Sequence, residues 1–304
     1  MKRLKLYIMA TRPPFFTASI VPVLLGTAMA WAWYGKFSLV DFLLTLVGVI
    51  ALHAGANASN DYYDWKNGTD RYNKTFAFPF TGGSRMIPNG LISPEEMKAI
   101  FMVAYLIALA MGIILFIRHG YIVLVLGFIG LLSGYFYTAT PLFLAGKGVG
   151  EILIGLNFGI LITLGAFFVQ TDFLSWTPVI ASIPVSLLIT LVLWINQFQD
   201  SEADKKAGKV HLVARLGLNR AAQIYIVLLY LSYLSVIIGI LAKALPVWSL
   251  IVFVTLPVAI KTQKIVKNNY NRFRELTPAN AATIKLHLNI GLLLAVSFII
   301  DKIL

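Results

Sequence analysis

Cysteine is absent from the sequence, and charged residues are scarce. Without cysteine the chain cannot form disulfide bonds, thiolate nucleophiles or cysteine-based zinc and iron–sulfur sites. A metal site would need oxygen or imidazole ligands, which favours Mg2+ or another hard cation. Charged residues are 12% of the 304 residues and hydrophobic residues are 59%, with a mean hydropathy of +0.81. This composition leaves too little polar surface to cover a soluble globule and predicts a multi-pass membrane protein.

Apolar runs of about 20 residues, long enough to cross a bilayer, occur nine times. Their approximate bounds are 16–34, 40–64, 97–117, 121–137, 151–169, 178–199, 221–244, 248–265 and 284–303. We therefore expect an all-α integral membrane protein, a bundle of nine transmembrane helices that forms a single domain of residues 1–304. The basic N-terminus precedes the first run without a small-residue cleavage site, so we expect it to be retained.

The basic residues predict how the bundle is oriented. If the N-terminus is cytoplasmic, all but four of the 25 Lys and Arg residues fall in cytoplasmic segments or in the adjoining helix starts. The four exceptions are Lys36, Arg118, Lys243 and Lys302. The positive-inside rule thus predicts a cytoplasmic N-terminus and, after nine crossings of the cell membrane, an external C-terminus. The net charge of +12 has the same origin, because no folded basic module indicates a nucleic-acid partner.

The second apolar run ends in a concentration of amide and carboxylate side chains, NASNDYYDWKNGTD. On a helix, Asn60 and Asp64 stand at i and i+4 on one face, with Asn57 one turn earlier and Asp70 just beyond. Such a face presents a cluster of hard oxygen ligands. A single acidic helix end is often only a solvated face, so this cluster alone does not decide between the two interpretations.

The sixth apolar run ends in the same way, in NQFQDSEAD. Asn196, Asp200 and Asp204 are spaced i, i+4 and i+8, so one helical face again carries three oxygen ligands. The two stretches hold six of the chain's 13 acidic residues, namely Asp61, Asp64, Asp70, Asp200, Glu202 and Asp204. Because the second and sixth runs cross the membrane in the same direction, both clusters face the cytoplasm. Two matched clusters on one side favour a joint site over two solvated faces.

Two carboxylate clusters at a membrane surface suit a ligand that is both anionic and apolar. Carboxylates bind an anion only through bridging divalent cations, and a prenyl diphosphate with Mg2+ meets both demands. The cations would stabilise the diphosphate as a leaving group, and an electron-rich acceptor would capture the allylic carbocation in a dry pocket. The loops 71–96 and 205–220 could supply basic residues to the diphosphate, namely Arg85 and one or two of Lys205, Lys206 and Lys209, and Lys147 is a further basic candidate outside these loops. Tyr137 could shield the carbocation, or could simply anchor the helix at the interface.

At these motifs the sequence resembles the UbiA superfamily of intramembrane prenyltransferases, whose paired aspartate-rich motifs follow the second and sixth of nine helices. The resemblance spans nearly the whole chain. It implies that Mg2+, as two ions, and the diphosphate are bound by Asn60, Asp61, Asp64, Asp70, Asn196, Asp200 and Asp204, of which Asn60, Asp64, Asn196 and Asp200 are the central catalytic set. Arg12-Pro13 looks like the family's opening Arg-Pro. Lys147, within YTATPLFLAGKGVGE, matches a family lysine that reaches the diphosphate, and Lys205 is our further candidate for substrate binding.

Two departures from the common pattern resemble the menaquinone branch, the 1,4-dihydroxy-2-naphthoate prenyltransferases. Five residues rather than three separate Asp64 from Asp70, and the next loop reads TGGSRMIPNG instead of an Arg-Pro-rich sequence. This resemblance implies a prenyl diphosphate donor, an aromatic acceptor and a demethylmenaquinone product formed with loss of carbon dioxide. Ser84 and Arg85 are the candidates for the acceptor side. Homogentisate, 4-hydroxybenzoate, haem and glycerol-phosphate lipids remain alternative acceptors, since all occur on similar scaffolds.

An ion-coupled secondary transporter is the alternative from another class, because Asn and Asp at helix ends also coordinate coupling ions. Transporter sites tend to lie near the bilayer midplane on broken helices. Both clusters here end unbroken apolar runs, which favours the enzyme. A purely structural membrane scaffold would not need six acids gathered at two points.

Overall fold

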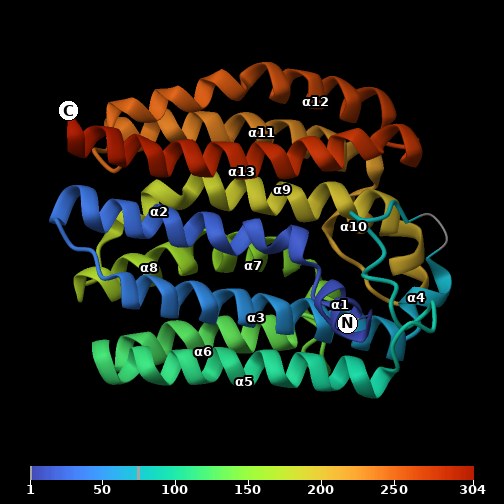
Figure 1. The fold of residues 1–304 in the computed structure, drawn as a ribbon. Coiled ribbons are helices and arrows are strands. Elements are labelled where there is room, and N and C mark those ends of the chain that lie inside the picture. The colour runs from blue at the N-terminus through green and yellow to red at the C-terminus, as the bar shows by residue number, and fades with distance from the viewer. Residues whose placement is uncertain (1, 74–75) are drawn as a thin grey trace.

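The computed structural model describes residues 2–73 and 76–304 and contains only helices and loops in that part of the chain. The helices run alongside one another in one elongated bundle (Figure 1). In chain order they are α1 (Lys2–Ala10), η1 (Pro13–Phe16), α2 (Thr17–Tyr34), α3 (Leu39–Lys66), α4 (Thr69–Tyr72), α5 (Pro94–His119), α6 (Tyr121–Phe136), η2 (Leu144–Lys147), α7 (Gly150–Gly155), η3 (Leu156–Leu161), α8 (Ile162–Thr171), α9 (Trp176–Lys206), α10 (Leu212–Leu216), α11 (Leu218–Leu241), η4 (Val247–Thr255), α12 (Leu256–Asn269) and α13 (Phe273–Ile303).

The expected nine membrane-crossing segments are present in the described residues. Eight helical segments are long and apolar enough to cross a membrane, and the ninth, α6, is an apolar helix of 16 residues. Two of the eight are built from more than one element, since α7, η3 and α8 form Gly150–Thr171, and η4 with α12 forms Val247–Asn269. The chain is therefore an all-helical integral membrane protein, as the hydropathy pattern predicts.

Local signals in the sequence set where these helices begin and end. Ser93 and Glu96 form a capping box at the start of α5, because each side chain accepts a hydrogen bond from the other's backbone N–H. Gly35, in the left-handed conformation, ends α2. Gly120 alone separates α5 from α6. Short connections of this kind force consecutive helices to run antiparallel.

The two sides of the bundle are packed differently. The largest hydrophobic cluster joins α2, α9, α11 and α13, where Leu25, Leu188, Tyr225 and Phe298 are fully buried. On the other side, α3, α5 and α6 lie together at one edge of the bundle (Figure 1), and only 17% of the most apolar stretch of α5 is buried. The interior of that side is hollow, and the cavity it encloses is described below.

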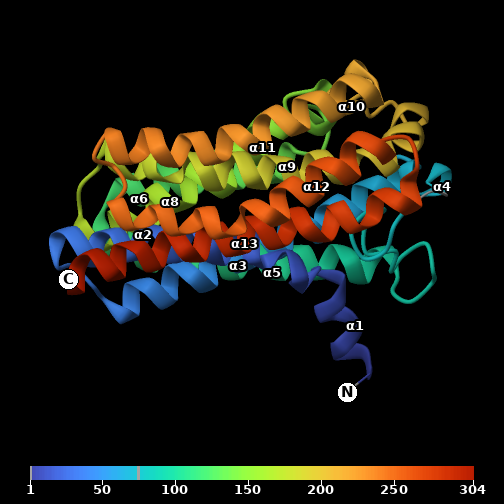
Figure 2. The ribbon, with the colours of Figure 1, turned by 90° about the horizontal axis from the view of Figure 1, so that it is seen from above.

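The N-terminus and the C-terminus lie at opposite ends of the bundle (Figure 1). The short helices α1, α4 and α10 gather at the N-terminal end, and α1 projects from the side of the bundle (Figure 2). Ala10 at the end of α1 packs in one small cluster with Met86, Ile92 and Phe101. The last turns of α3 and α9 also lie at this end, which brings the two acidic motifs together.

Candidate active site

The two aspartate-rich motifs face one cavity at the N-terminal end of the bundle. The cavity has a volume of about 740 Å3. Motif residues that line it are Asn60, Asp64 and Asp70 from the first motif and Asn196, Asp200 and Asp204 from the second. Asn60 and Asp64 lie in the last turns of α3, and the residues of the second motif lie in the last turns of α9, so helical periodicity places the i and i+4 side chains on the cavity side. Asp70 reaches the cavity from α4. Six of the seven predicted metal ligands are thus brought together.

Lys209 joins the two motifs. Its Nζ lies 3.3 Å from Oδ2 of Asp64 and 3.9 Å from Oδ2 of Asp204. Burial acts to lower the pKa of Lys209, but the carboxylates of Asp204 and Asp64 outweigh it and raise the pKa above its ordinary value. The ammonium group is therefore charged at neutral pH and neutralises part of the negative charge of both motifs.

Asp200 is held by the loop that follows the first motif. Asn73 donates from Nδ2 to Oδ1 of Asp200 at 2.7 Å, and the backbone N–H of Gly82 donates to Oδ2 at 3.3 Å. Thr81, Gly82 and Gly83 also line the cavity. This loop therefore closes the end of the cavity by reaching across from α3 to α9.

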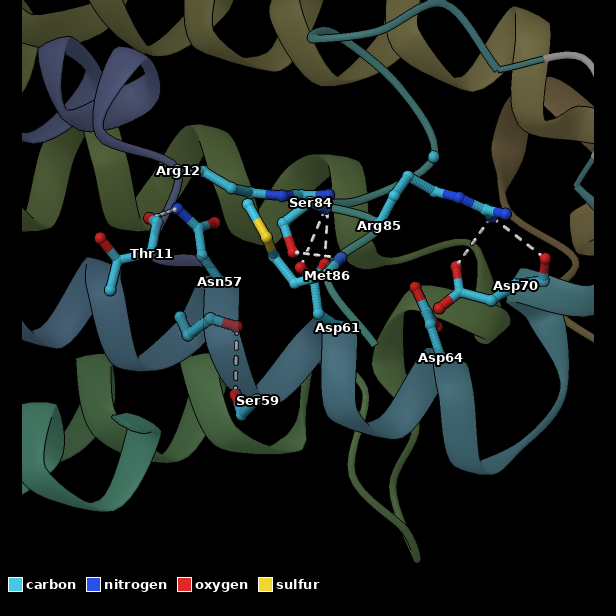
Figure 3. A network of polar contacts seen from close by, with 12 residues as sticks. Thr11, Arg12, Asn57, Ser59, Asp61, Asp64, Asp70, Ser84, Arg85 and Met86 are labelled. Atoms are coloured by element: carbon cyan, nitrogen blue, oxygen red, sulfur yellow. Dashed lines mark hydrogen bonds and ion pairs between the residues drawn. The ribbon is translucent and has the colours of Figure 1, made fainter. Parts of the chain in front are cut away.

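Asp61 has a different environment from the other motif acids. It is buried and is not among the residues that line the cavity. Its Oδ1 lies 3.3 Å from Nη2 of Arg12, and its Oδ2 accepts a 2.9 Å hydrogen bond from the backbone N–H of Ser84 (Figure 3). Asp61 therefore anchors the loop and the chain segment after α1.

Asp70 lies in α4 at the mouth of the cavity and is paired with Arg85 (Figure 3). Arg85 Nη1 is 3.6 Å from Asp70 Oδ1 and donates a 3.1 Å hydrogen bond to the Asp70 carbonyl oxygen. The Arg85 guanidinium also lies over the ring of Phe76, 4.6 Å from its centre. Burial, followed by the nearby charges of Asp64 and Asp61, raises the pKa of Asp70 to about 7 despite the opposing effect of Arg85.

The other predicted substrate-binding residues occupy varied positions. Tyr137 lines the cavity, and burial raises the pKa of its hydroxyl, so the side chain is neutral. Ser84 is buried beside Asp61 and accepts a hydrogen bond at Oγ from the Met86 N–H. Lys147, at the end of η2, and Lys205, in the last turn of α9, are both exposed to solvent. Ser84, Arg85, Lys147 and Lys205 do not contribute to the cavity wall.

Some residues that shape the site were not singled out from the sequence. Asn280 of α13 donates from Nδ2 to Oδ1 of Asn196 at 2.7 Å, and its own Oδ1 accepts from Nε2 of Gln199 at 2.9 Å. This buried amide network orients the first residue of the second motif. No sequence pattern connects Asn280 with Asn196 across 84 residues. Lys209 was one of three lysines named from the sequence, and Gly208, two residues after the end of α9, is the signal that sets it apart, because it turns the chain back toward the motif.

Buried oxygen atoms without hydrogen-bond partners indicate whether the site suits a metal. Asp64 Oδ1, Asn73 Oδ1 and Gln197 Oε1 have no hydrogen-bond partner in the described structure, and all three residues line the cavity. An unpaired buried oxygen costs about 1–3 kcal/mol, which a bound cation would offset. In residues 2–73 and 76–304, no group of three or more His, Asp or Glu side chains is placed to hold a metal ion alone. Mg2+ commonly binds one or two carboxylates and completes its shell with substrate phosphates, so the site fits Mg2+ shared with a phosphate-bearing ligand.

From the mouth, the cavity extends between the helices toward the other end of the bundle. Along α3 its wall runs from Asp64 to Thr45, which corresponds to about 28 Å of helix. The deep part is lined by apolar side chains such as Leu115, Val123 and Val169. A ligand with a charged head and a long apolar tail matches this distribution of polar and apolar walls.

The geometry fits a ligand with a phosphate-bearing head and an apolar tail, and comparison with known proteins identifies the family of the chain. The model of the UbiA prenyltransferase family matches residues 19–283. The 1,4-dihydroxy-2-naphthoate octaprenyltransferase of Bacillus subtilis is 30% identical over 254 residues, covering 84% of this chain and 79% of that protein. The 2-carboxy-1,4-naphthoquinone phytyltransferase of Synechocystis is 26% identical over 298 residues, covering 97% and 93%. The chain belongs to the UbiA prenyltransferase family and is a membrane prenyltransferase.

The fold is likewise that of solved members of the family. A UbiA homolog from Archaeoglobus fulgidus, solved bound to DMAPP and Mg2+, superimposes with a TM-score of 0.63 at 18% identity, covering 93% of this chain and 98% of that one. Because the chain belongs to a family of prenyltransferases, the interpretation as an ion-coupled transporter is no longer needed. The likeness at the level of structure concerns the bundle and the arrangement of its helices.

Proposed function

We propose that this chain transfers a polyprenyl group from a prenyl diphosphate to 1,4-dihydroxy-2-naphthoate, in a Mg2+-dependent reaction of menaquinone synthesis. The observation that carries the proposal is the meeting of two acidic motifs at the mouth of a long apolar cavity. The motifs suit the metal-bound diphosphate, and the cavity suits the isoprenoid tail. The whole chain, residues 1–304, acts as one domain in this proposal.

The motif residues divide the binding of the diphosphate between two helices. Asn60, Asp64 and Asp70 would hold Mg2+ and the head group from one side, and Asn196, Asp200 and Asp204 would hold them from the other, with two Mg2+ ions in all. Bound there, Mg2+ would neutralise the diphosphate and stabilise it as the leaving group. The unpaired oxygens of Asp64, Asn73 and Gln197 support this assignment.

Basic and aromatic side chains complete the head-group site. Lys209 and Arg85 lie within ion-pair distance of motif acids and can turn toward the diphosphate. Tyr137 lines the cavity, and its aromatic ring can stabilise an allylic carbocation through its π face. Contact of Lys147 and Lys205 with the diphosphate remains a prediction, since both side chains are exposed to solvent.

The naphthoate acceptor is supported by the names of two relatives. The Bacillus subtilis and Synechocystis proteins both act on naphthalene-ring acceptors by their names. Ser84 and Arg85 remain our candidates for the acceptor side, because their loop covers the mouth. Homogentisate, 4-hydroxybenzoate and glycerol-phosphate lipids are the alternatives that an acceptor panel separates.

The mouth faces the cytoplasm in this proposal. The N-terminus lies at the mouth and the C-terminus at the far end (Figure 1), and the basic loops gather at the mouth as the positive-inside rule requires. Reporter fusions should place the two termini on opposite sides of the cell membrane. Both termini on one side would refute the nine-span topology.

One assay tests the reaction. Detergent-purified protein is given Mg2+, geranylgeranyl diphosphate and each acceptor in turn, and the products are read by mass spectrometry. We expect a prenylated naphthoquinol that has lost the acceptor's carboxylate. Prenylation of another acceptor, with none of the naphthoate, would overturn the acceptor assignment while leaving the family assignment intact.

A further inference from the structure

Lys209 is placed where a divalent cation would bridge the two motifs. Among the described residues it is the only basic side chain that lies within 4.0 Å of acids from both motifs, through Asp64 at 3.3 Å and Asp204 at 3.9 Å. Arg12 and Arg85 each pair with first-motif acids alone. The ammonium group therefore links α3 and α9 across the mouth of the cavity.

The backbone around Lys209 is fixed, whereas its ammonium is at the end of a flexible stem. The Lys209 N–H donates a 2.8 Å hydrogen bond to the Asp204 carbonyl oxygen. Two residues later, Nε2 of the fully buried His211 lies 3.3 Å from Oδ2 of Asp204. The Leu212 N–H donates to Oε1 of the buried Glu151 at 2.7 Å. The ammonium can thus change partners by rotating its side chain while the segment stays in place.

Lys209 competes with any metal for the same acids. Its ammonium occupies Oδ2 of Asp64, whereas Oδ1 of that carboxylate has no partner in the described structure. A divalent cation between Asp64 and Asp204 would lie within a few ångströms of the ammonium, and the two positive charges would repel each other. The ammonium needs another anion before it can leave, and a diphosphate arriving at the mouth is such an anion.

We propose that Lys209 is a built-in counter-ion, which takes the place of a divalent cation between the motifs in the metal-free enzyme and moves to the diphosphate when both ligands enter. The proposal rests on the proposed function of the site, and it adds that tight binding of the metal depends on the diphosphate. Metal alone must displace the ammonium and binds weakly. Metal with diphosphate gives the ammonium a new partner and binds tightly, so each ligand strengthens the binding of the other.

The test measures metal affinity rather than turnover. Mn2+ binding to the purified protein is followed by electron paramagnetic resonance, with and without inorganic pyrophosphate. We expect the wild type to bind Mn2+ about tenfold more tightly with pyrophosphate than without it, within the usual range for coupled sites. Lys209→Met removes the competing charge, so Mn2+ alone should bind about tenfold more tightly than to the wild type. The strengthening by pyrophosphate should largely disappear in this variant.

Matched variants separate this role from a general effect of charge. Lys66→Met removes an exposed lysine two residues after Asp64 and should leave Mn2+ binding as in the wild type. Lys209→Arg keeps the charge and should keep the coupling. If Lys209→Met does not accumulate as folded protein, Lys209→Gln supplies the same test, because its amide can still donate to both carboxylates.

The outcomes distinguish this proposal from the function on which it rests. Unchanged or weaker binding of Mn2+ alone in both Lys209→Met and Lys209→Gln would overturn the counter-ion role while the metal site stands. A wild type that binds neither Mn2+ nor pyrophosphate would overturn the metal site itself. Metal-free Lys209→Met should also unfold at a lower temperature than the wild type, and Mn2+ should restore more of its stability.

Discussion

Gly83 lies so close to Asp61 that a Cβ on Gly83 would be 2.7 Å from Oδ1 of that carboxylate. The same Cβ would be 3.1 Å from Nη2 of Arg12, so it would enter the ion pair itself. The loop over the mouth can take this path only because residue 83 has no side chain. The glycines that set TGGSRMIPNG apart in the sequence thus have a structural reason.

We expect Gly83→Ala to separate Asp61 from Arg12 and from the Ser84 N–H, and to lower kcat/KM for prenyl transfer at least tenfold. Gly90→Ala is the matched control, because both glycines have positive φ values, 74° and 65°, but nothing lies within 4 Å of a Cβ at Gly90. Backbone strain of roughly 1–2 kcal/mol is common to both variants. Equal loss of activity in the two would show that strain, rather than the contact with Asp61, is responsible.

Asp64→Asn and Asp200→Asn test the two motifs separately. Each change keeps the size of the side chain but removes the charge that would attract Mg2+, so folding should be nearly unaffected. Loss of one metal contact should cost roughly 3 kcal/mol of transition-state stabilisation, about a hundredfold in kcat. Steady-state rates of prenyl transfer measure the loss.

Asp172→Asn is the control for these two substitutions. Asp172 pairs with His119 at 2.6 Å, far from the mouth and largely exposed, with 66% of its side chain accessible. An exposed ion pair contributes at most about 1 kcal/mol to stability, so activity should be nearly unchanged. Similar losses in all three variants, with folding intact, would contradict a site built on two motifs.

The depth of the cavity should limit the length of the prenyl chain. Gly130 of α6 lines the cavity, and a Cβ there would lie 3.5 Å from Leu52 and 3.6 Å from Leu161, which line it as well. We expect Gly130→Leu to fill this part of the cavity and to lower kcat/KM about tenfold or more for geranylgeranyl diphosphate, with a smaller loss for geranyl diphosphate.

Ile129→Phe adds bulk on an exposed part of α6, at a residue outside the cavity wall, and serves as the comparison. This variant should keep the wild-type preference for chain length. If Gly130→Leu lowers activity with both donors by the same factor, the tail does not pass this point.

The raised pKa of the Asp70 carboxyl group predicts how metal binding depends on pH. Burial and the nearby charges of Asp64 and Asp61 raise its pKa to about 7, so it is mostly protonated below that pH and must lose a proton to bind a cation. The stability contributed by the neutral form is present at low pH and is lost as pH rises through about 7. The increase in Tm on adding Mg2+ should therefore be larger at pH 8 than at pH 6. Asp70→Asn should flatten this difference, whereas an unchanged pH dependence would exclude Asp70 as its source.

Helical periodicity was sufficient to predict the shared face of each motif. Asn60 with Asp64, and Asn196 with Asp200, are one turn apart, and their helices run in the same direction, so the sequence alone predicts that the two faces meet. The same periodicity also separates Asp61 from that face, because one residue corresponds to about 100° of rotation. Its contact with the loop follows from this rotation.

Contacts between distant segments could not be predicted in this way. The choice of Lys209 over Lys205 depends on the turn after α9, which directs one lysine inward and leaves the other in water. The hydrogen bond from Asn280 to Asn196 depends on how α13 packs against α9. The hollow interior beside α5 and α6 likewise depends on how apolar helices pack, which hydropathy does not record.

The most direct test of the account is prenyl transfer by purified wild-type protein in excess EDTA, followed by addition of Mg2+. The two motifs cannot hold a diphosphate without a divalent cation, so product should be undetectable in EDTA and should form again when Mg2+ exceeds the chelator. Thermal unfolding of the same sample in EDTA shows that the protein is still folded. Full turnover in EDTA would contradict the central claim that the motifs act through a metal-bound diphosphate.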